Sequence, residues 1–468
     1  MIQKTLQKEL KELSRDGRVR VTLLLILLLL GVAVWISSRQ YQNINQQYTE
    51  AREHERNIWE AQGAKNPHSA AHYGTYAFKP KYPLSLLDQG VDKFAGVSVF
   101  LEAHKRNETQ FSAAADQTGL SRFGDLTPDF ILLFMIPILI ILMGYNSFTK
   151  EKELGTIALL RSQGAVTWKV VTGKWLALFL PVLLLVILFF GTAAIVLTNL
   201  RDFGVFNMPS LVVMALVYVL YYIIFINLVL FVSYVFKRSG IALVSSLAIW
   251  ILTCFAMPKV ASNFAEAKYP YPTRQQFATN VAEDKKQGLD GHNPWSKEAK
   301  LLEKKVLKEY KVDSLHQLPF NFDAYRMQKG EEHEAEIYFK HYKHLKEQFG
   351  KQKQTYHTLS ILSPFLPVRF LSMSIAKTDY QTHWDFADAA ERYRIDTQKF
   401  LNDNFAQNSS YGEWSYRATA DTWKQLPEFE YKPTALGTTL AQNTSNIIIL
   451  GSWTALTFLL LFFTAKKL

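Results

Sequence analysis

The chain has 468 residues, of which 49% are hydrophobic, and a formal net charge of +11. Its mean hydropathy of −0.03 is too low for a compact transporter, and its apolar residues are too concentrated in runs for a soluble enzyme. The basic residues form no patch interleaved with aromatic side chains, so no nucleic-acid partner is expected. The single cysteine, Cys254, rules out a disulfide within the chain.

The N-terminal residues 1–20 predict an amphipathic helix. One side carries apolar residues at helical spacing, with charged residues between them: Ile2, Leu6, Leu10 and Leu13. A basic helix with one apolar stripe is suited to lying on the inner leaflet of a membrane. An ordinary solvated helix is the alternative, and the apolar run that follows directly favours the membrane surface.

Six apolar runs are long enough, or nearly so, to cross a bilayer core of about 30 Å. They are Val21–Ile36, Phe130–Tyr145, Trp175–Leu200, Leu211–Phe236, Ile241–Met257 and Ile447–Ala465. The first run could also be a cleaved signal peptide, but no small-x-small cleavage site follows it. The runs predict an all-α membrane protein with six transmembrane helices.

The distribution of lysine and arginine predicts the orientation of these spans. Basic residues gather in residues 1–20, in the loop after the second run, in the turn at Lys237-Arg238, and in the tail at Lys466-Lys467. Because short cytoplasmic segments are enriched in basic residues, we expect both termini in the cytoplasm. The protein is then a multi-pass protein of the cell (inner) membrane, with two long segments on its outer side.

The two outer segments are Ser37–Asp129 and Pro258–Ser445. The first begins with helical spacing, so the first span is expected to continue out of the membrane as a helix. The second holds three ranges with helical apolar spacing: Ser296–Val312, Asp323–Gln354 and Thr382–Phe405. Neither segment looks self-sufficient, so we expect one large, mainly helical extracytoplasmic domain that both segments build together. The proline-broken run Ile361–Ala376 is expected to pack near the membrane surface.

The loop of residues 146–174 carries the most informative motif. A charged helix between two spans is expected there, in the sequence Lys150-Glu151-Lys152-Glu153-Leu154-Gly155-Thr156, which continues to Leu160 and is followed by Gly173-Lys174. The alternative without a partner is a solvated basic loop that only sets the orientation of the protein in the membrane. The motif resembles the coupling helix of ABC-2-type transporter permeases, which have a Glu-x-Gly-Thr sequence and a downstream Gly-Lys.

The resemblance implies partners and a role for these residues. In that family the segment rests on a separate ATP-hydrolysing subunit, so the ATPase-coupling residues would be Lys150, Glu151, Glu153, Gly155, Thr156, Leu160, Gly173 and Lys174. Two ATPase copies would bind ATP and Mg²⁺, and a second permease copy or a sister permease would complete the complex. The stretch Ala376–Arg394 resembles a branch of the family with a large extracytoplasmic insert, which could contact an envelope partner. Residues 1–20 resemble the family's elbow helix.

The chain itself shows no catalytic motif. Neither Gly173-Lys174 nor Gly350-Lys351 lies in a phosphate-binding loop, so the chain is expected to be a non-catalytic subunit without a cofactor of its own. His333-Glu334 begins like a zinc-protease helix, but Ile337 stands where the second histidine should be. His341 and His344 lie nearby on the same charged stretch, and histidines there are usually solvated. We therefore assign no metal ligands.

Polar residues inside the spans are few and mostly uncharged, which disfavours an ion-driven transporter. Tyr218, Tyr222 and Asn227 are candidates for a substrate path, although such side chains more often make helix contacts. Three functions remain open: the permease of an exporter or extruder, a mechanotransmission complex that acts on an envelope partner without substrate passage, and a membrane-anchored scaffold or receptor. The sequence identifies no substrate.

Overall fold

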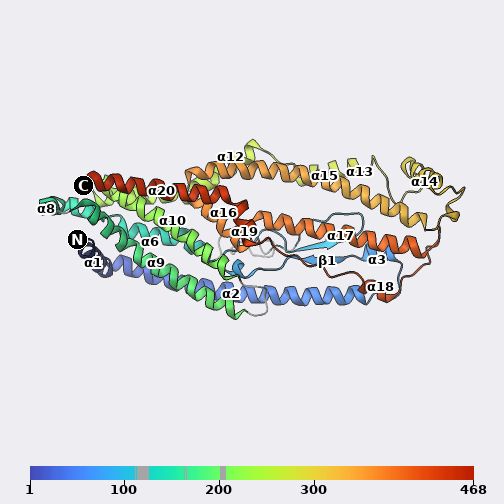
Figure 1. The fold of residues 1–468 in the computed structure, drawn as a ribbon, viewed down its shortest axis with the longest axis horizontal. Coiled ribbons are helices and arrows are strands. Elements are labelled where there is room, and N and C mark those ends of the chain that lie inside the picture. Colours follow the sequence, from blue (N-terminus) through green and yellow to red (C-terminus); the bar gives the residue numbers. More distant parts are fainter. Residues whose placement is uncertain (111, 113–125, 163, 165, 201–206, 468) are drawn as a thin grey trace.

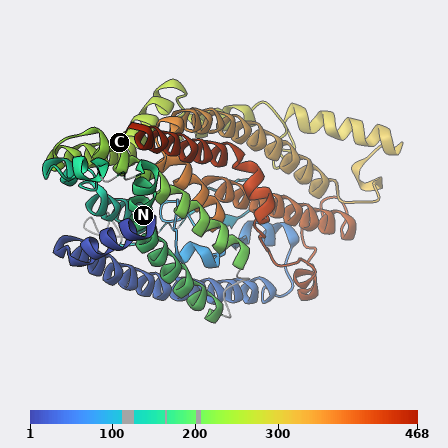
Figure 2. The same cartoon turned by 60° about the vertical axis from the view of Figure 1, so that its left-hand side comes forward.

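The structure is a computed structural model of the 468-residue chain, and it describes residues 1–110, 112, 126–162, 164, 166–200 and 207–467. The molecule is elongated, with a bundle of apolar helices at one end and an insert domain at the other (Figure 1). Both termini lie at the bundle end (Figure 1, Figure 2). The insert domain comprises the chain between the first and second spans and between the fifth and sixth. Residues 113–125, which the sequence analysis places in the first insertion, lie outside the described residues.

Six helices among the described residues are long and apolar enough to cross a membrane, as the sequence predicts. They are Gly17–Glu60, Pro128–Glu153, Thr167–Asn199, Met208–Val235, Ser239–Lys268 and Thr444–Phe463. Their elements are α2 (Gly17–Glu60), α5 (Pro128–Phe130), η3 (Ile131–Met135), α6 (Ile136–Gly144), α9 (Thr167–Asn199), α10 (Met208–Val235), α11 (Ser239–Ile251), η4 (Leu252–Ala256), α12 (Met257–Lys268) and α20 (Thr444–Lys467). Each helix extends beyond the apolar run that predicts it at one end at least.

Helix α10 is the centre of the bundle. It contacts α6, α9, α11 and α20, and buried residues lie on every side of it. A helix that is apolar all round belongs in the interior of a bundle, because it has no polar face to expose. The fourth span is therefore the element against which the second, third, fifth and sixth spans pack, whereas α2 packs on α6 and α9.

Two of the spans contain a π-helical turn, and α10 supplies partners for one of them. The π-helix η3 interrupts the second span, and η4 interrupts the fifth. Tyr222 donates its hydroxyl to the carbonyl of Leu132 at 3.0 Å, and Tyr221 donates to the carbonyl of Leu133 at 3.0 Å. Both carbonyls lie in η3, where backbone groups need partners because a membrane interior offers no water.

Helix α2 is 44 residues long, which corresponds to about 66 Å at 1.5 Å per residue. That length is about twice the bilayer core, so the helix must project well beyond it. The predicted span Val21–Ile36 is thus only one section of this helix, and the expected continuation of the span as a helix is confirmed. Tyr41, Asn45 and Trp59 are buried on the projecting part, which packs on the insert domain.

The insert domain is mainly helical, as predicted. Its elements are α3 (Pro67–Tyr73), β1 (Thr75–Phe78), η1 (Pro83–Leu86), β2 (Ser98–Leu101), α12, α13 (Arg274–Lys285), α14 (Lys297–Tyr310), η5 (Leu315–Gln317), α15 (Phe322–Leu359), η6 (Ser360–Leu362), α16 (Phe365–Ala376), α17 (Tyr380–Asn408), α18 (Ala420–Lys424) and α19 (Leu436–Gln442). Helices α14, α15 and α17 match the three predicted helical ranges. Strands β1 and β2 form an antiparallel pair, with Thr75 opposite Leu101.

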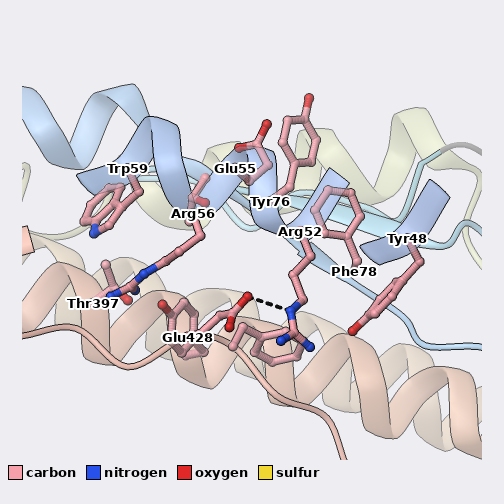
Figure 3. Close-up of a pocket in the computed structure, with 12 residues that line it drawn as sticks. Tyr48, Arg52, Glu55, Arg56, Trp59, Tyr76, Phe78, Thr397 and Glu428 are labelled. Atoms are coloured by element: carbon pink, nitrogen blue, oxygen red, sulfur yellow. Dashed lines mark ion pairs between the residues drawn. The ribbon is translucent and has the colours of Figure 1, made fainter. Parts of the chain in front are cut away.

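The two insertions share hydrophobic cores, as the sequence analysis predicts. Trp59 and Ala70 from the first insertion pack with Leu401 and Trp423 from the second. The indole of Trp59 donates to the carbonyl of Trp423 at 3.1 Å. Figure 3 shows the neighbouring contact, where α2 faces α17 and Arg52 forms an ion pair with Glu428 at 2.7 Å.

Helix α16 joins the insert domain to the bundle. It is almost entirely buried and contacts α10 and α20. Its Arg369 bridges two carboxylates, at 2.9 Å from Asp88 of the first insertion and 2.6 Å from Asp129 at the start of the second span. Ser372 donates to Asp88 at 2.6 Å and contacts the hydroxyl of Tyr218 on α10 at 3.1 Å. This chain of polar contacts runs from the first insertion through the second to the fourth span.

Candidate coupling site

The motif-bearing loop lies at the bundle end, close to both termini (Figure 1). It forms two short helices, α7 (Thr149–Glu153) and α8 (Thr156–Ser162). The prediction of one continuous helix over Lys150–Leu160 is therefore wrong. Gly155 has a φ of +71°, in the left-handed region that glycine adopts without a steric penalty, and this residue separates the two helices.

The N-terminal helix α1 (Ile2–Arg15) packs against α9 beside this loop. The helix ends at Arg15 rather than at the predicted residue 20, because Asp16 separates it from α2 and accepts a hydrogen bond from the backbone of Arg18 at 2.9 Å. Gly173 of α9 allows the close approach. A Cβ atom at Gly173 would lie 2.6 Å from the Cβ atom of Thr5, so a larger residue would push α1 away.

A buried ion cluster locks α1, α7 and α9 together. The Lys174 side chain is only 1% exposed, and its Nζ atom lies 2.6 Å from Glu9 and 2.9 Å from Glu151. It also donates to the carbonyl of Ser147 at 2.8 Å. Lys8 of α1 contacts the same oxygen of Glu151 at 2.9 Å. Since buried charges are costly unless they are paired, this cluster requires all three helices to stay in register.

The other end of α7 is held by the turn between α10 and α11. Glu153 accepts hydrogen bonds from the backbone nitrogen of Ser239 at 2.6 Å and from its hydroxyl at 2.8 Å. Lys152 donates to the carbonyls of Tyr234 and Phe236. Helix α7 therefore connects the first helix of the chain to the hairpin of the fourth and fifth spans.

The outer face of the loop is apolar and exposed. Leu154 is 67% exposed and Leu159 is 58% exposed, and Gly155 and Ala158 are also exposed. Most of the predicted coupling residues thus make contacts within the chain, and the others lie in the exposed part of the loop. Glu151, Glu153, Gly173 and Lys174 make internal contacts, as does Lys150, which pairs with Glu12 at 2.8 Å. Thr156 bonds the Glu151 carbonyl, Gly155 lies on the exposed face, and Leu160 lies in α8.

Part of this arrangement leaves no signal in the sequence. The exposed leucines stand inside the motif, but nothing in their spacing separates them from buried ones. The partners Lys8 and Glu9 lie on the predicted amphipathic helix, and their pairing with residues more than 140 positions away leaves no local signal.

The candidate path residues make helix contacts. Tyr218, Tyr222 and Asn227 are almost completely buried. Asn227 accepts from the Trp175 indole at 2.7 Å and donates to the Thr457 hydroxyl at 3.1 Å, so it joins α10 to α9 and α20. The hydroxyls of the two tyrosines are bonded to α16 and η3, as described above.

The histidines that the sequence analysis considers do not come together. His341 pairs with Asp284 at 2.8 Å, His344 is exposed, and His333 lies against Gly288. Four other histidines do gather in the insert domain: His68, His72, His104 and His292. Burial and the neighbouring rings of His72 and His292 lower the pKa of His68 to about 3, so its imidazole is neutral at physiological pH.

The fold is that of a multi-spanning membrane protein with a large insert domain. Over residues 4–467 the chain matches the family model described as ABC-2 family transporter protein, and it therefore belongs to that family. No curated protein sequence matches the chain significantly. Family membership makes the chain the transmembrane permease of an ABC transporter, a class of membrane subunit that is typically non-catalytic and pairs with an ABC ATPase subunit.

Proposed function

We propose that this permease is driven by a separate ATPase subunit that docks on the exposed face of α7 and α8. The observation that carries the proposal is that Leu154 and Leu159 are exposed next to a helix that a buried ion cluster holds in place. That cluster consists of Lys174, Glu9 and Glu151. Exposed apolar side chains on a fixed support are typical of protein interfaces. Two ATPase copies would bind ATP and Mg²⁺, and a second permease copy or a sister permease would complete an exporter or extruder.

The contacts of α7 support a route for ATP-driven motion. A push on α7 and α8 would act on α1 and α9 through Lys174 and Glu151, and on the fourth and fifth spans through Glu153. Helix α2 follows α1 after a single residue and reaches the insert domain. The fifth span also continues into that domain, through α12. Movement at one end of the molecule would therefore reach the other without crossing a flexible linker.

Docking predicts that a charge on the apolar face abolishes the interaction. The double variant Leu154→Asp/Leu159→Asp should reduce copurification of the ATPase at least tenfold, which corresponds to about 1.4 kcal/mol. It should also remove the stimulation of ATP turnover by the permease. Leu301→Asp is the matched control, because Leu301 is similarly exposed on α14 in the insert domain. Equal ATPase recovery from the double variant and the control would remove this face from the coupling role.

We further propose that α7, α8 and both termini lie in the cytoplasm, and that the insert domain lies outside the inner membrane. Basic residues at the bundle end support this orientation. In a Cys254→Ser background, cysteines at Glu108 and Asp421 should react with an impermeant thiol reagent in intact cells, and a cysteine at Ser162 should not. All three positions are exposed, so the opposite labelling pattern would reverse the orientation.

Mechanotransmission without substrate passage is the second candidate. The observation in its favour is that Tyr218, Tyr222 and Asn227 are all engaged in helix contacts, while α2 and the fifth span both continue as helices into the insert domain. The ATP turnover of the reconstituted complex separates the two functions. An exporter is stimulated by its transported compound, whereas a mechanotransmission complex is stimulated by an envelope partner added on the insert-domain side.

A further inference from the structure

The insert domain brings four histidines from three separate segments to one point. His68 and His72 lie one turn apart on α3, His104 follows β2, and His292 lies between α13 and α14. One ring nitrogen from each lies within 4.8 Å of the corresponding atom of every other. The Nε2 atom of His68 is 3.2 Å from that of His72 and 3.3 Å from that of His292.

The two distances from His68 are those of neighbouring ligands around one ion. Zinc–nitrogen bonds of about 2.0–2.1 Å in a tetrahedral site place neighbouring nitrogens about 3.3–3.4 Å apart. Hydrogen bonds between the imidazole rings do not explain why these nitrogens lie so close together. The single Nε2 atom of His68 faces two ring nitrogens, and it can share only one proton with one of them.

His104 is oriented by a buried carboxylate. Its Nδ1 atom lies 2.6 Å from Oε1 of Glu331, and its backbone nitrogen donates to the same oxygen at 2.8 Å. Arg394 holds the other oxygen of Glu331 at 3.2 Å.

The other ring nitrogen of His104 remains for a ligand. This Nε2 atom is buried, and it has no hydrogen-bond partner among the described residues. A histidine that donates one N–H to a carboxylate and presents its other nitrogen to an ion is the usual arrangement at metal sites. The backbone of His104 is left-handed, with a φ of +63°. That conformation is uncommon for a residue other than glycine and fixes the direction in which the ring projects.

The loop that carries His292 is held against α15 by close backbone packing. A Cβ atom on Gly330 would lie 2.6 Å from the Cα atom of Gly291, so the helix and the loop touch where neither has a side chain. Arg326 donates to the carbonyl of Gly291 at 3.1 Å, and Asp290 accepts from the backbone of His292 at 2.9 Å. The position of His292 is therefore set by the fold rather than by a free loop.

We propose that His68, His72, His104 and His292 bind one divalent transition-metal ion, with Zn²⁺ as the reference ion. Imidazole nitrogen suits zinc, copper and nickel, whereas magnesium and calcium prefer oxygen. His72 and His292 are exposed, so the ion enters from solvent. Three ligands come from the first insertion and one from the second, so the bound ion cross-links the two insertions.

Metal content and affinity test the proposal on the full chain in detergent, purified with a tag that lacks histidine. The wild-type protein should bind one Zn²⁺ per chain in competition with a chromogenic chelator, and Co²⁺ should give the absorption of a tetrahedral site. The double variant His68→Ala/His104→Gln should lose at least 100-fold in affinity. Removal of Zn²⁺ should lower the melting temperature of the wild-type protein and leave that of the double variant unchanged.

The double variant His341→Ala/His344→Ala is the matched control, because it removes two histidines that lie elsewhere in the same domain. It should bind Zn²⁺ as the wild type does. Two results would overturn the proposal: a wild-type protein that takes up no Zn²⁺ at micromolar concentration, or equal Zn²⁺ stoichiometry in the wild type and in His68→Ala/His104→Gln. The melting temperature of each variant without metal shows whether it is folded, and a single His72→Ala variant replaces any that is not.

Discussion

The bundle and the insert domain are both helical, but different contacts hold them together. In the bundle, apolar helices pack round α10, and polar side chains mainly serve neighbouring backbone groups, as Tyr222 serves Leu132. In the insert domain, segments far apart in the sequence meet through shared cores and buried ion pairs, such as Arg394 with Glu331. Apolar packing gains little from lipid exclusion inside a membrane, whereas outside it the hydrophobic effect drives assembly.

The two regions meet at α16, where both kinds of contact occur. Its apolar side chains join the core of the bundle, and its Arg369 bridges Asp88 of the first insertion and Asp129 at the start of the second span. Removal of one partner from a buried ion cluster is strongly destabilising, because the remaining charges stay buried without compensation. The arginine and its two carboxylates therefore help to fix the geometry of the junction.

The largest effect is expected from Trp423→Ala in the shared core. Trp423 is fully buried, and loss of a buried tryptophan should destabilise the insert domain by about 3–5 kcal/mol. Because the bundle does not depend on this core, thermal unfolding in detergent should separate into two steps, with the insert domain melting first. Trp295→Ala is the control, since Trp295 is 81% exposed and should have almost no effect. A single unfolding step at a lower temperature would show that the two regions unfold as one unit.

A smaller effect is expected from Lys174→Met in the ion cluster at the opposite end. This change leaves Glu151 buried with Lys8 as its remaining cation, so we expect a loss of about 2–3 kcal/mol in thermal unfolding. Lys150→Met is the matched control, because Lys150 also pairs with a glutamate of α1 but is half exposed. Exposed pairs contribute less than about 1 kcal/mol. Equal losses in the two variants would mean that burial does not strengthen the contact between α1 and α7.

Hydropathy and periodicity predict most of the fold, because both are local properties. The six spans need only apolar runs of sufficient length, and α14, α15 and α17 need only the spacing of their apolar residues. The sequence shows a glycine at position 155 but does not show that the helix ends there. The helix ends because the backbone of Gly155 is left-handed. That conformation depends on the surrounding contacts.

The side chains that meet across the fold were not predictable in the same way. His68 and His72 are spaced four residues apart after Asn66-Pro67, a pattern that marks the start of a helix with both rings on one side. His104 and His292 reach them only because β2 pairs with β1 and because Gly291 packs on Gly330. In the bundle, the hydrogen bonds of Tyr221 and Tyr222 could not be predicted, because their acceptors are carbonyls of the π-helix η3, which has no signal in the sequence.

The smallest effect is expected from Tyr222→Phe, which tests whether polar contacts contribute to the bundle at all. The change removes the hydroxyl bonded to the Leu132 carbonyl and keeps the ring, so packing is preserved. A buried backbone carbonyl without its partner should cost about 1 kcal/mol. Thermal unfolding in detergent measures this, with Tyr310→Phe on exposed α14 as the control. If the two variants melt at the same temperature, η3 does not need the tyrosine hydroxyl, and apolar packing alone holds the second span against the fourth.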